Sequence, residues 1–274
     1  MRRTLLLAAV LFVAPLRASG QDGATTPEGD WIDRLVREEA LAHHVPGLGL
    51  SIVAHGKVVA ERVYGLADVE RGLPVTTATG FNIASVSKPF TALAVLRMAS
   101  RGELALDEPA STHLTWLPRT FATLTLRQLL THTSGIVRDV RTGNDDDPSA
   151  AEYRERILAA DPSAEPGARF EYSNTGYAVL GWAAEAASGL TFEQLLAREV
   201  FTPAEMPDAR FRTPLAEPER AQPYRWEDDK MVRDGYVSGG FGSGGLILSV
   251  RDFTAFARAL QGERLMTAAL HNIA

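Results

Sequence analysis

The pattern of apolar and polar positions after residue 30 begins with a helical period. Asp30 is placed to cap a helix that runs to about His44, where Pro46-Gly47 ends it. Four apolar side chains recur at helical spacing in this segment: Ile32, Leu35, Val36 and Leu41. Because residues three or four apart lie on the same side of a helix, we expect these four to form one buried face.

A change to a two-residue period then predicts a β-hairpin. The runs Leu48 to Ala54 and Val58 to Tyr64 read as strands joined at His55-Gly56-Lys57. From Ser85 onward the pattern is mainly helical. Helices are predicted over Phe90 to Ser100 and Tyr177 to Ser188, and capping boxes at Thr125–Gln128, Ser149–Glu152 and Thr191–Gln194 open three more.

The last third of the chain mixes several patterns. Phe201 to Asp234 is polar and contains prolines, and Ser238 to Gly245 holds five glycines. A short apolar run, Leu246 to Leu248, precedes a helix predicted over Val250 to Gln261. The pattern thus yields two convincing strands and a weak third, although an isolated hairpin is only marginally stable in water. We therefore expect the sequence to be truncated at its C-terminus, with further strands missing.

The first 20 residues have the pattern of an export signal. Arg2 and Arg3 precede the apolar run Thr4 to Leu16, and Ala18-Ser19-Gly20 offers a cleavage site before Gln21. The apolar run is shorter than the roughly 20 residues that a bilayer-spanning helix needs. We expect residues 1–20 to be removed and residues 21–274 to form one domain in the periplasm or outside the cell, without a stable membrane anchor.

Composition narrows the function classes. The chain has 274 residues, 45% of them hydrophobic, which suffices for a substantial core. Its formal charge is -6, and removal of the signal with its three arginines makes the charge more negative, which argues against nucleic-acid binding through phosphates. The absence of Cys excludes disulfides, thiolate metal sites and a Cys nucleophile.

One motif carries the elements of nucleophilic catalysis. Ser85-Val86-Ser87-Lys88 is an S-x-x-K sequence where a helix begins, so Ser85 and Lys88 fall on one face about a turn apart. A serine hydroxyl needs a base to remove its proton, and a buried lysine can serve as one. Only three of the 28 basic residues are Lys, and Arg cannot act as a base. Taken alone, the motif favours the alternative, a Ser helix cap beside a solvated Lys.

A second motif, Tyr172-Ser173-Asn174, lies just before another predicted helix. A phenol near Lys88 can pass a proton between Ser85 and a leaving group, and Asn174 can donate to a substrate carbonyl. The alternative is an Asn helix cap beside a packed Tyr. The two motifs together are more specific than either one.

The surrounding sequence resembles a known superfamily. Its segments occur in the expected order: Pro46–Leu50, Phe81–Lys88, Leu129–Gly135, Phe170–Tyr177 and the Gly-rich Gly239–Leu248. They are similar to the serine hydrolases that include class C β-lactamases, penicillin-binding D,D-peptidases, esterases and D-aminopeptidases. The resemblance covers about residues 30–260. It implies an α/β (α+β) domain with an antiparallel sheet flanked by helices, next to a mostly helical region.

The same resemblance implies roles for the two motifs. Ser85 would be the acylated nucleophile, Lys88 and Tyr172 the proton-transfer pair, and Asn174 a substrate-orienting group. The family's third motif, K-T-G or H-x-G on a strand that lines the site, has no match after Asn174. His271-Asn272-Ile273 lacks the glycine. This gap agrees with the shortage of strands.

Other candidate residues received structural interpretations. We expect His132 to form a structural hydrogen bond rather than to act in catalysis. Tyr236 and the nearby glycines either border the substrate cleft or, as is more common for Gly-rich loops, simply meet the geometry of a turn. Neither His43-His44 nor Asp145-Asp146-Asp147 has the spacing of a metal site, so we predict no metal and no cofactor.

The sequence therefore predicts an exported, monomeric serine hydrolase that acts on an amide, lactam or ester bond of a small-molecule or peptide substrate. The missing third motif motivates an alternative, a non-catalytic penicillin-binding or sensor protein of the same fold.

Overall fold

The computed structural model describes residues 28–143, 148–211, 220–235, 240–267 and 270. The predicted signal peptide, Asp145–Asp147, Tyr236 and His271–Ile273 lie outside the described residues. The described part of the chain is mixed α/β, as predicted, and every ladder between its named strands is antiparallel.

The predicted hairpin forms the largest sheet. Strand β1 (Gly47–Ala54) pairs with β2 (Lys57–Asp68), with a register shift at Ile52/Val53, and β2 continues to the two-residue strand β3 (Leu73–Pro74). The loop between β1 and β2 is His55-Gly56, and both residues have positive φ angles, 50° and 72°. That geometry belongs to a two-residue hairpin whose turn follows the twist of the strands.

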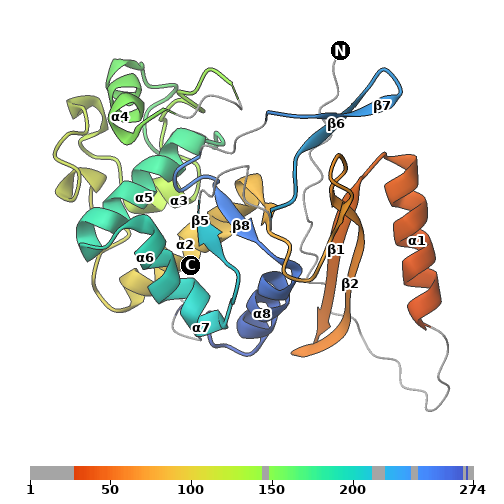
Figure 1. The fold of residues 1–274 in the computed structure, drawn as a ribbon. Helices are drawn as coiled ribbons and strands as arrows, with labels where there is room; N and C mark the ends of the chain where they lie inside the picture. The colour runs from red at the N-terminus through yellow and green to blue at the C-terminus, as the bar shows by residue number, and fades with distance from the viewer. Residues whose placement is uncertain (1–27, 144–147, 212–219, 236–239, 268–269, 271–274) are drawn as a thin grey trace.

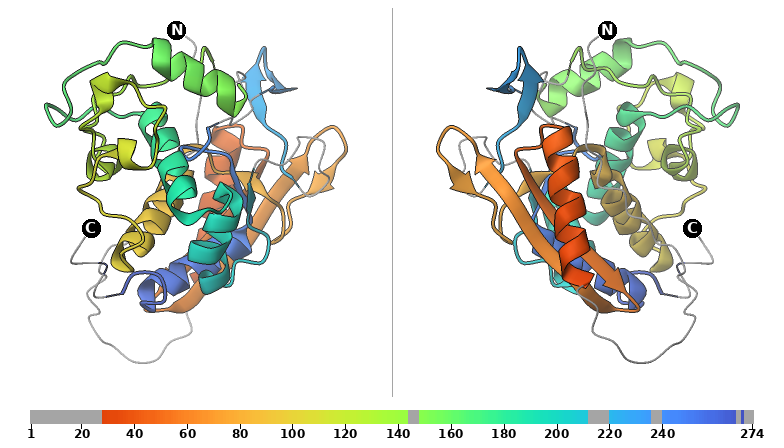
Figure 2. Two further views of the ribbon diagram at one scale, coloured as in Figure 1. Left: turned by 90° about the vertical axis from the view of Figure 1, so that its left-hand side faces the viewer. Right: turned by 90° about the vertical axis from the view of Figure 1, so that its right-hand side faces the viewer.

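Two helices cover the two faces of this hairpin (Figures 1 and 2). Helix α1 (Glu28–Ala42) lies on one face, and α8 (Val250–Gln261) lies on the other. Contacts from β1 hold α8: the Ser51 hydroxyl lies 2.8 Å from that of Thr254, and the Val53 carbonyl accepts a hydrogen bond from Gln261.

The rest of the described chain is mostly helical. A 3₁₀ turn over Ala84–Ser87 leads into α2 (Lys88–Ser100), and a five-residue π-helical segment, Ala197–Phe201, links α6 to α7. The other helices here are α3 (Leu126–Leu130), α4 (Ala150–Ala159), α5 (Asn174–Ser188), α6 (Phe192–Leu196) and α7 (Thr202–Ala204), with 3₁₀ turns at Ala110–Thr112 and Arg119–Phe121. The three predicted capping boxes are confirmed, because each Ser or Thr accepts from the backbone N–H three residues later.

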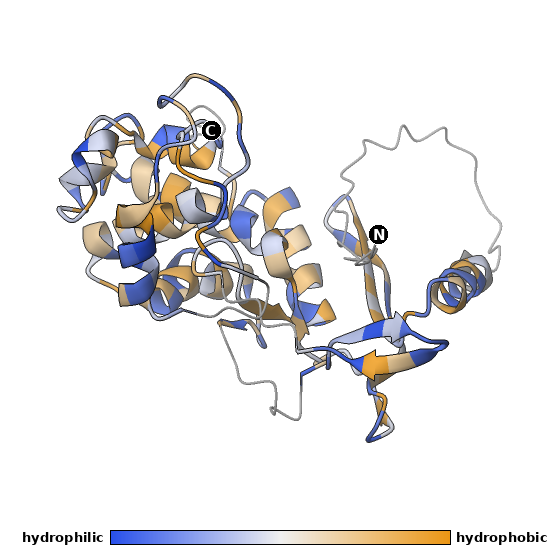
Figure 3. Ribbon diagram, turned by 90° about the horizontal axis from the view of Figure 1, so that it is seen from above, coloured by the Kyte–Doolittle hydropathy of each residue, from blue (hydrophilic) through white to orange (hydrophobic). Residues whose placement is uncertain are grey.

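The main hydrophobic core lies between these helices. Its members fall between residues 83 and 265, and Phe90, Met98, Leu129 and Leu180 are among its fully buried side chains. Every residue of α5 from Thr175 to Ala184 is buried. Figure 3 shows hydrophobic residues gathered in the helices of this region.

The sequence pattern missed most of the short strands. Strand β8 (Leu246–Leu248) is the centre of a small sheet, with β4 (Phe81–Asn82) on one edge and β5 (Arg210–Phe211) on the other. Two-residue strands are too short to show an alternation, because pairing to a buried neighbour defines them rather than their own pattern.

The predicted polar excursion also contains a second hairpin, β6 (Tyr224–Glu227) and β7 (Lys230–Arg233). Asp228 and Asp229, with φ of 49° and 57°, form its two-residue turn. A pair of Asp residues adopts this left-handed conformation less readily than the Asn-Gly pair that usually marks such a turn. The usual hairpin signal is therefore absent from the sequence.

The predicted buried face of α1 is only partly correct. Ile32 is buried, but Leu35 is 47% exposed and Leu41 is 79% exposed. Polar contacts join α1 to β2 instead: Asp33 accepts hydrogen bonds from Arg62 and from the Tyr64 hydroxyl. Within the described residues, no helix is both long and apolar enough to cross a membrane.

Candidate active site

Ser85 lies in the 3₁₀ turn that precedes α2, one short element earlier than the predicted helical turn. The preceding residue, Ala84, has a φ of +46°, which is unusual for a residue with a Cβ. Hydrogen bonds hold this conformation: Asn82 accepts from the Ala84 N–H through its side chain, and the Ser87 hydroxyl donates to the Ala84 carbonyl. The backbone strain at Ala84 therefore sits next to the candidate nucleophile.

Lys88 points back from the first residue of α2 toward Ser85. Its Nζ donates to Ser85 Oγ at 3.3 Å, to Asn174 Oδ1 at 2.8 Å and to the Ser243 carbonyl at 2.9 Å. The residue is only 5% exposed. The structure thus brings Ser85, Lys88 and Asn174 together, as their motifs predict.

Burial lowers the pKa of the Lys88 amine from 10.5 to about 7, because removing an ammonium from water disfavours its charged form. The positive charge of Arg141 lowers this pKa further, Asp139 opposes the effect, and Arg138 adds to it. The electrostatic environment therefore supplies a largely neutral amine at mildly alkaline pH.

Tyr172 is next to Lys88 but presents its ring. The Lys88 Nζ lies 4.7 Å from the centroid of the Tyr172 ring, a cation–π distance. Within the described residues, no hydrogen bond joins the Tyr172 hydroxyl to Ser85 or Lys88. Tyr172 is thus close to Ser85 and Lys88, as its motif predicts, but its hydroxyl is not part of a proton path between them.

His132 supports this tyrosine. Its Nδ1 accepts a hydrogen bond from the Ser173 N–H at 3.1 Å, and its ring packs on those of Tyr172 and Tyr177. Burial, and then the charge of Lys88, lower the pKa of His132, which favours the neutral ring that can accept this bond. The predicted structural hydrogen bond of His132 is confirmed.

Asn174 is the first residue of α5, and Ser173 rather than Asn174 caps that helix. The Asn174 side chain is held at both ends: Oδ1 accepts from Lys88, and Nδ2 donates to Asp139 Oδ2 at 2.8 Å. The helix-cap alternative for Asn174 is therefore wrong, and the amide group is oriented within the site.

Asp139 and Arg141 are site residues that the sequence analysis did not identify. Arg141 donates to both Asp139 carboxylate oxygens, at 3.1 and 2.7 Å. Burial alone would raise the pKa of Asp139, but hydrogen bonds from Arg141 and Asn174 outweigh it and keep this pKa below its ordinary value. Nothing in a single sequence distinguishes Arg141 from the other arginines, because its position depends on a loop between α3 and α4.

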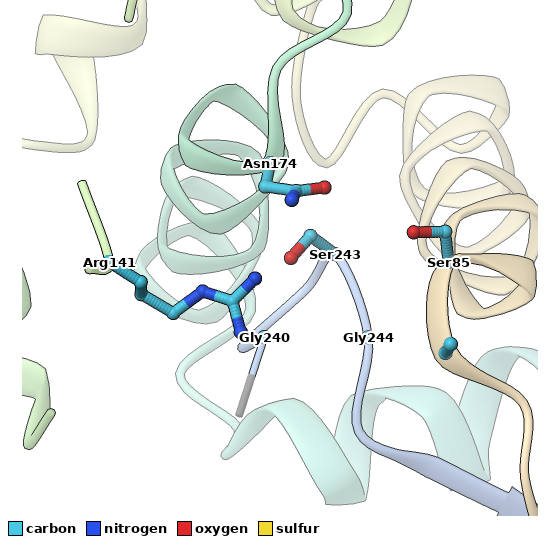
Figure 4. Close-up of a pocket in the computed structure, with 7 residues that line it drawn as sticks. Ser85, Arg141, Asn174, Gly240, Ser243 and Gly244 are labelled. Atoms are coloured by element: carbon cyan, nitrogen blue, oxygen red, sulfur yellow. The ribbon is translucent and has the colours of Figure 1, made fainter. Parts of the chain in front are cut away.

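The Gly-rich segment completes the pocket (Figure 4). The residues that line it are Ala84, Ser85, Arg141, Asn174, Gly240, Ser243 and Gly244. The Thr91 hydroxyl donates to the Gly242 carbonyl at 2.6 Å and ties this segment to α2. Gly242 has a φ of +67°, and a Cβ there would lie 2.3 Å from the Tyr177 carbonyl oxygen, so a side chain cannot be accommodated.

The arrangement has the parts of a covalent hydrolase: a hydroxyl, an amine that can take its proton, and an oriented amide beside them. In the described part of the chain, no group of three His, Asp or Glu side chains is placed to hold a metal ion. The absence of a metal and of a cofactor stays a prediction.

Comparisons with known proteins agree on one family. The model of the β-lactamase family matches residues 32–273. The chain is 29% identical to "Protein flp" of Staphylococcus aureus strain MW2 over 188 residues, which is 66% of this chain and 38% of that protein. It is 30% identical to "Putative penicillin-binding protein PbpX" of Bacillus subtilis strain 168 over 232 residues, 82% of this chain and 58% of that protein.

A solved structure is also similar. The octameric penicillin-binding protein homologue from Pyrococcus abyssi matches with a TM-score of 0.74 and 27% identity, over 89% of this chain and 59% of that one. The matches thus span 38% and 58% of the two curated relatives.

Proposed function

The chain belongs to the β-lactamase family, and we propose that it is an exported serine hydrolase that cleaves amide, lactam or ester bonds through an acyl-enzyme. The observation that carries the proposal is the 3.3 Å contact between Ser85 Oγ and the buried Nζ of Lys88. The family membership and the solved relative support the fold, and the contacts of Lys88 with Ser85 and Asn174 support the chemistry.

In the first step, Lys88 takes the proton of Ser85 as Oγ forms a bond to the substrate carbonyl carbon. Collapse of the tetrahedral intermediate breaks the C–N or C–O bond, and the leaving group receives a proton through Lys88 and Tyr172. Water then attacks the acyl carbon, and its proton returns along the same path to free Ser85 Oγ. Asn174 orients the substrate through its amide.

The lowered pKa decides whether Lys88 can act as a base. With its ordinary pKa, about one lysine side chain in 3000 is neutral at pH 7. With a pKa of about 7, half of the Lys88 amines are neutral at that pH. The step therefore needs no further base.

Replacing the nucleophile tests the proposal. We expect Ser85→Ala to lose covalent labelling by a fluorophosphonate and by a penicillin probe, and to lose turnover by about 10³-fold or more, because no acyl-enzyme forms. Intact-mass spectrometry measures the adduct. Ser100→Ala, at the far end of α2, is the matched control and should label like the wild type. Undiminished labelling of Ser85→Ala would contradict the assignment.

The alternative is a non-catalytic penicillin-binding or sensor protein. It is favoured by the position of Tyr172, whose ring rather than hydroxyl faces Lys88, since a missing proton path slows deacylation. A time course of intact mass after probe treatment separates the two functions. A permanent adduct supports the sensor, and a transient adduct supports the hydrolase.

Substrate and location remain parts of the proposal. The names of the relatives motivate the penicillin probe, while we favour a general hydrolase over a dedicated drug-resistance enzyme. We propose a monomer in the periplasm or outside the cell. Sequencing of the mature N-terminus should begin at Gln21, and light scattering should give the monomer mass rather than an octamer like that of the Pyrococcus abyssi relative.

A further inference from the structure

A buried cation shares the pocket with Ser85. The Arg141 side chain is 10% exposed and lines the same cavity as Ser85, Asn174 and Ser243. Figure 4 shows Ser85 and Arg141 on opposite sides of the pocket. In the acyl-enzyme steps described above, this charge acts on the pKa of Lys88 and has no direct role toward the substrate.

Asp139 fixes the direction of the guanidinium. It accepts from Nε and from Nη2 of Arg141, and its Oδ1 also accepts from the Arg141 backbone N–H at 3.0 Å. A guanidinium has five N–H donors in a planar fork and can serve several acceptors at once. The ion pair with Asp139 therefore orients Arg141 and is compatible with a further acceptor from the pocket side.

Among the described residues, the charges that act on Lys88 are unequal in number. Arg138 and Arg141 are positive, as is the protonated fraction of Lys88 itself, and Asp139 is negative. A concave site with an excess of one charge, partly shielded from water, attracts a ligand of the opposite charge. The pocket is thus suited to a substrate that carries an anion.

We propose that Arg141 is a specificity-determining residue that binds a carboxylate of the substrate. The inference rests on the proposed function, because it concerns the substrate of the same site. The carboxylate belongs either to the acyl part of the substrate or to its leaving group. Arg141 selects the substrates whose carboxylate lies beside Asn174. A purely structural Arg141, which only positions Asp139 and Asn174, would affect charged and neutral substrates equally.

Matched esters test the selectivity. For the acyl part, mono-4-nitrophenyl glutarate is compared with its methyl ester; for the leaving group, 3-acetoxybenzoate is compared with methyl 3-acetoxybenzoate. We expect the wild type to favour the anionic member of one pair, and that pair identifies the part that bears the carboxylate. Arg141→Gln should reduce this preference about 10- to 100-fold, the range of a charge-assisted hydrogen bond, while changing kcat/KM of the neutral ester far less.

Two further variants separate a contact from a general field. Arg138→Gln removes the same charge from a residue that is not among the described residues lining the pocket, and should leave the preference within threefold of the wild type. Arg141→Lys keeps the charge but not the planar fork, and should retain part of the preference. All rates are measured at pH 9, above the pKa of about 7 of Lys88, so that the amine is neutral in the wild type.

Binding in the Ser85→Ala background keeps the inference testable without turnover. Calorimetry should show that Ser85→Ala binds the anionic ester at least tenfold more tightly than its neutral counterpart, and that adding Arg141→Gln abolishes the difference. If Arg141→Gln leaves the preference intact, or if Arg138→Gln removes as much of it, the inference is wrong. Turnover that persists in Ser85→Ala would instead overturn the proposed function alone.

Discussion

The helical region, α2 to α7, and the β1–β2 hairpin bury their apolar side chains to different extents. Core residues such as Phe90 and Leu180 are fully buried, whereas no residue of β1 is buried. Within the described residues, Val58 and Val59 at the start of β2 are exposed, and so are Trp31, Leu35 and Leu41 of the helix α1 that covers the hairpin. The candidate site is built on the well-packed side, where a strained turn and a buried lysine can be held in place.

The well-packed helical region carries the candidate catalytic residues, whereas the hairpin serves as a scaffold. Ser85 and Lys88 come from the start of α2, and Asn174 comes from the start of α5. Both helices pack in the hydrophobic core, so tight packing fixes the distances between the three side chains. The hairpin contributes no side chain to the described lining of the pocket and acts through its contact with α8.

The largest expected effect comes from Lys88→Arg, which keeps the positive charge but replaces an amine that can lose a proton with a guanidinium that cannot. We expect a loss of kcat/KM of about 10³-fold or more, because an arginine does not deprotonate in proteins. In the wild type, kcat/KM should rise about tenfold per pH unit below pH 7 and level off above it, since the neutral amine is the active form and the pKa of Lys88 is about 7.

A pH–rate profile and a stopped-flow acylation assay measure both effects. Arg62→Gln, a charge removed from the hairpin instead, is the control and should show the wild-type profile. Substantial activity of Lys88→Arg would remove the base role from Lys88.

The sequence separation between contacting residues explains how much of the site could be predicted. Ser85 and Lys88 are three residues apart, so helical geometry alone brings them together, and both were predicted. Asp139 contacts Asn174 from a loop 35 residues earlier, and Arg141 pairs with Asp139, so only the tertiary structure shows that both belong to the site. Roles in catalysis stay predictions for all four predicted residues.

The same reasoning applies to the fold. Capping boxes at Thr125, Ser149 and Thr191 fixed three helix starts, because a cap is a local contact between a side chain and the nearby backbone. The strands β4 and β5 were missed, since a two-residue strand exists through its partner β8. The exposed Leu41 shows that helical spacing predicts a face but not what covers it.

A matched pair of leucines compares the packing of the two regions directly. Leu180→Ala in α5 should lower the free energy of unfolding by about 2–5 kcal/mol, the range for a large-to-small change in a close-packed core. Leu50→Ala in β1 removes the same atoms from a half-buried position and should cost about 1 kcal/mol. Urea denaturation followed by circular dichroism measures both. Equal losses would mean that the hairpin is as well packed as the helical region.

The smallest expected effect concerns Asp33, which joins α1 to the hairpin. Asp33→Ala removes the acceptor of the Tyr64 hydroxyl, 2.7 Å away, and the partner of Arg62. The ion pair is about one-third exposed, so we expect a loss of unfolding free energy of about 1 kcal/mol and unchanged kcat/KM.

Burial and then the Asp33 carboxylate raise the pKa of Tyr64 to about 12, so Asp33→Ala should lower that pKa only partly, as ultraviolet titration can measure. Asp33→Asn is the matched control, because its amide oxygen can still accept from Tyr64 while the negative charge is gone. A large loss of activity in Asp33→Ala, with the fold retained, would show that the hairpin supports the chemistry and does not serve as scaffold alone.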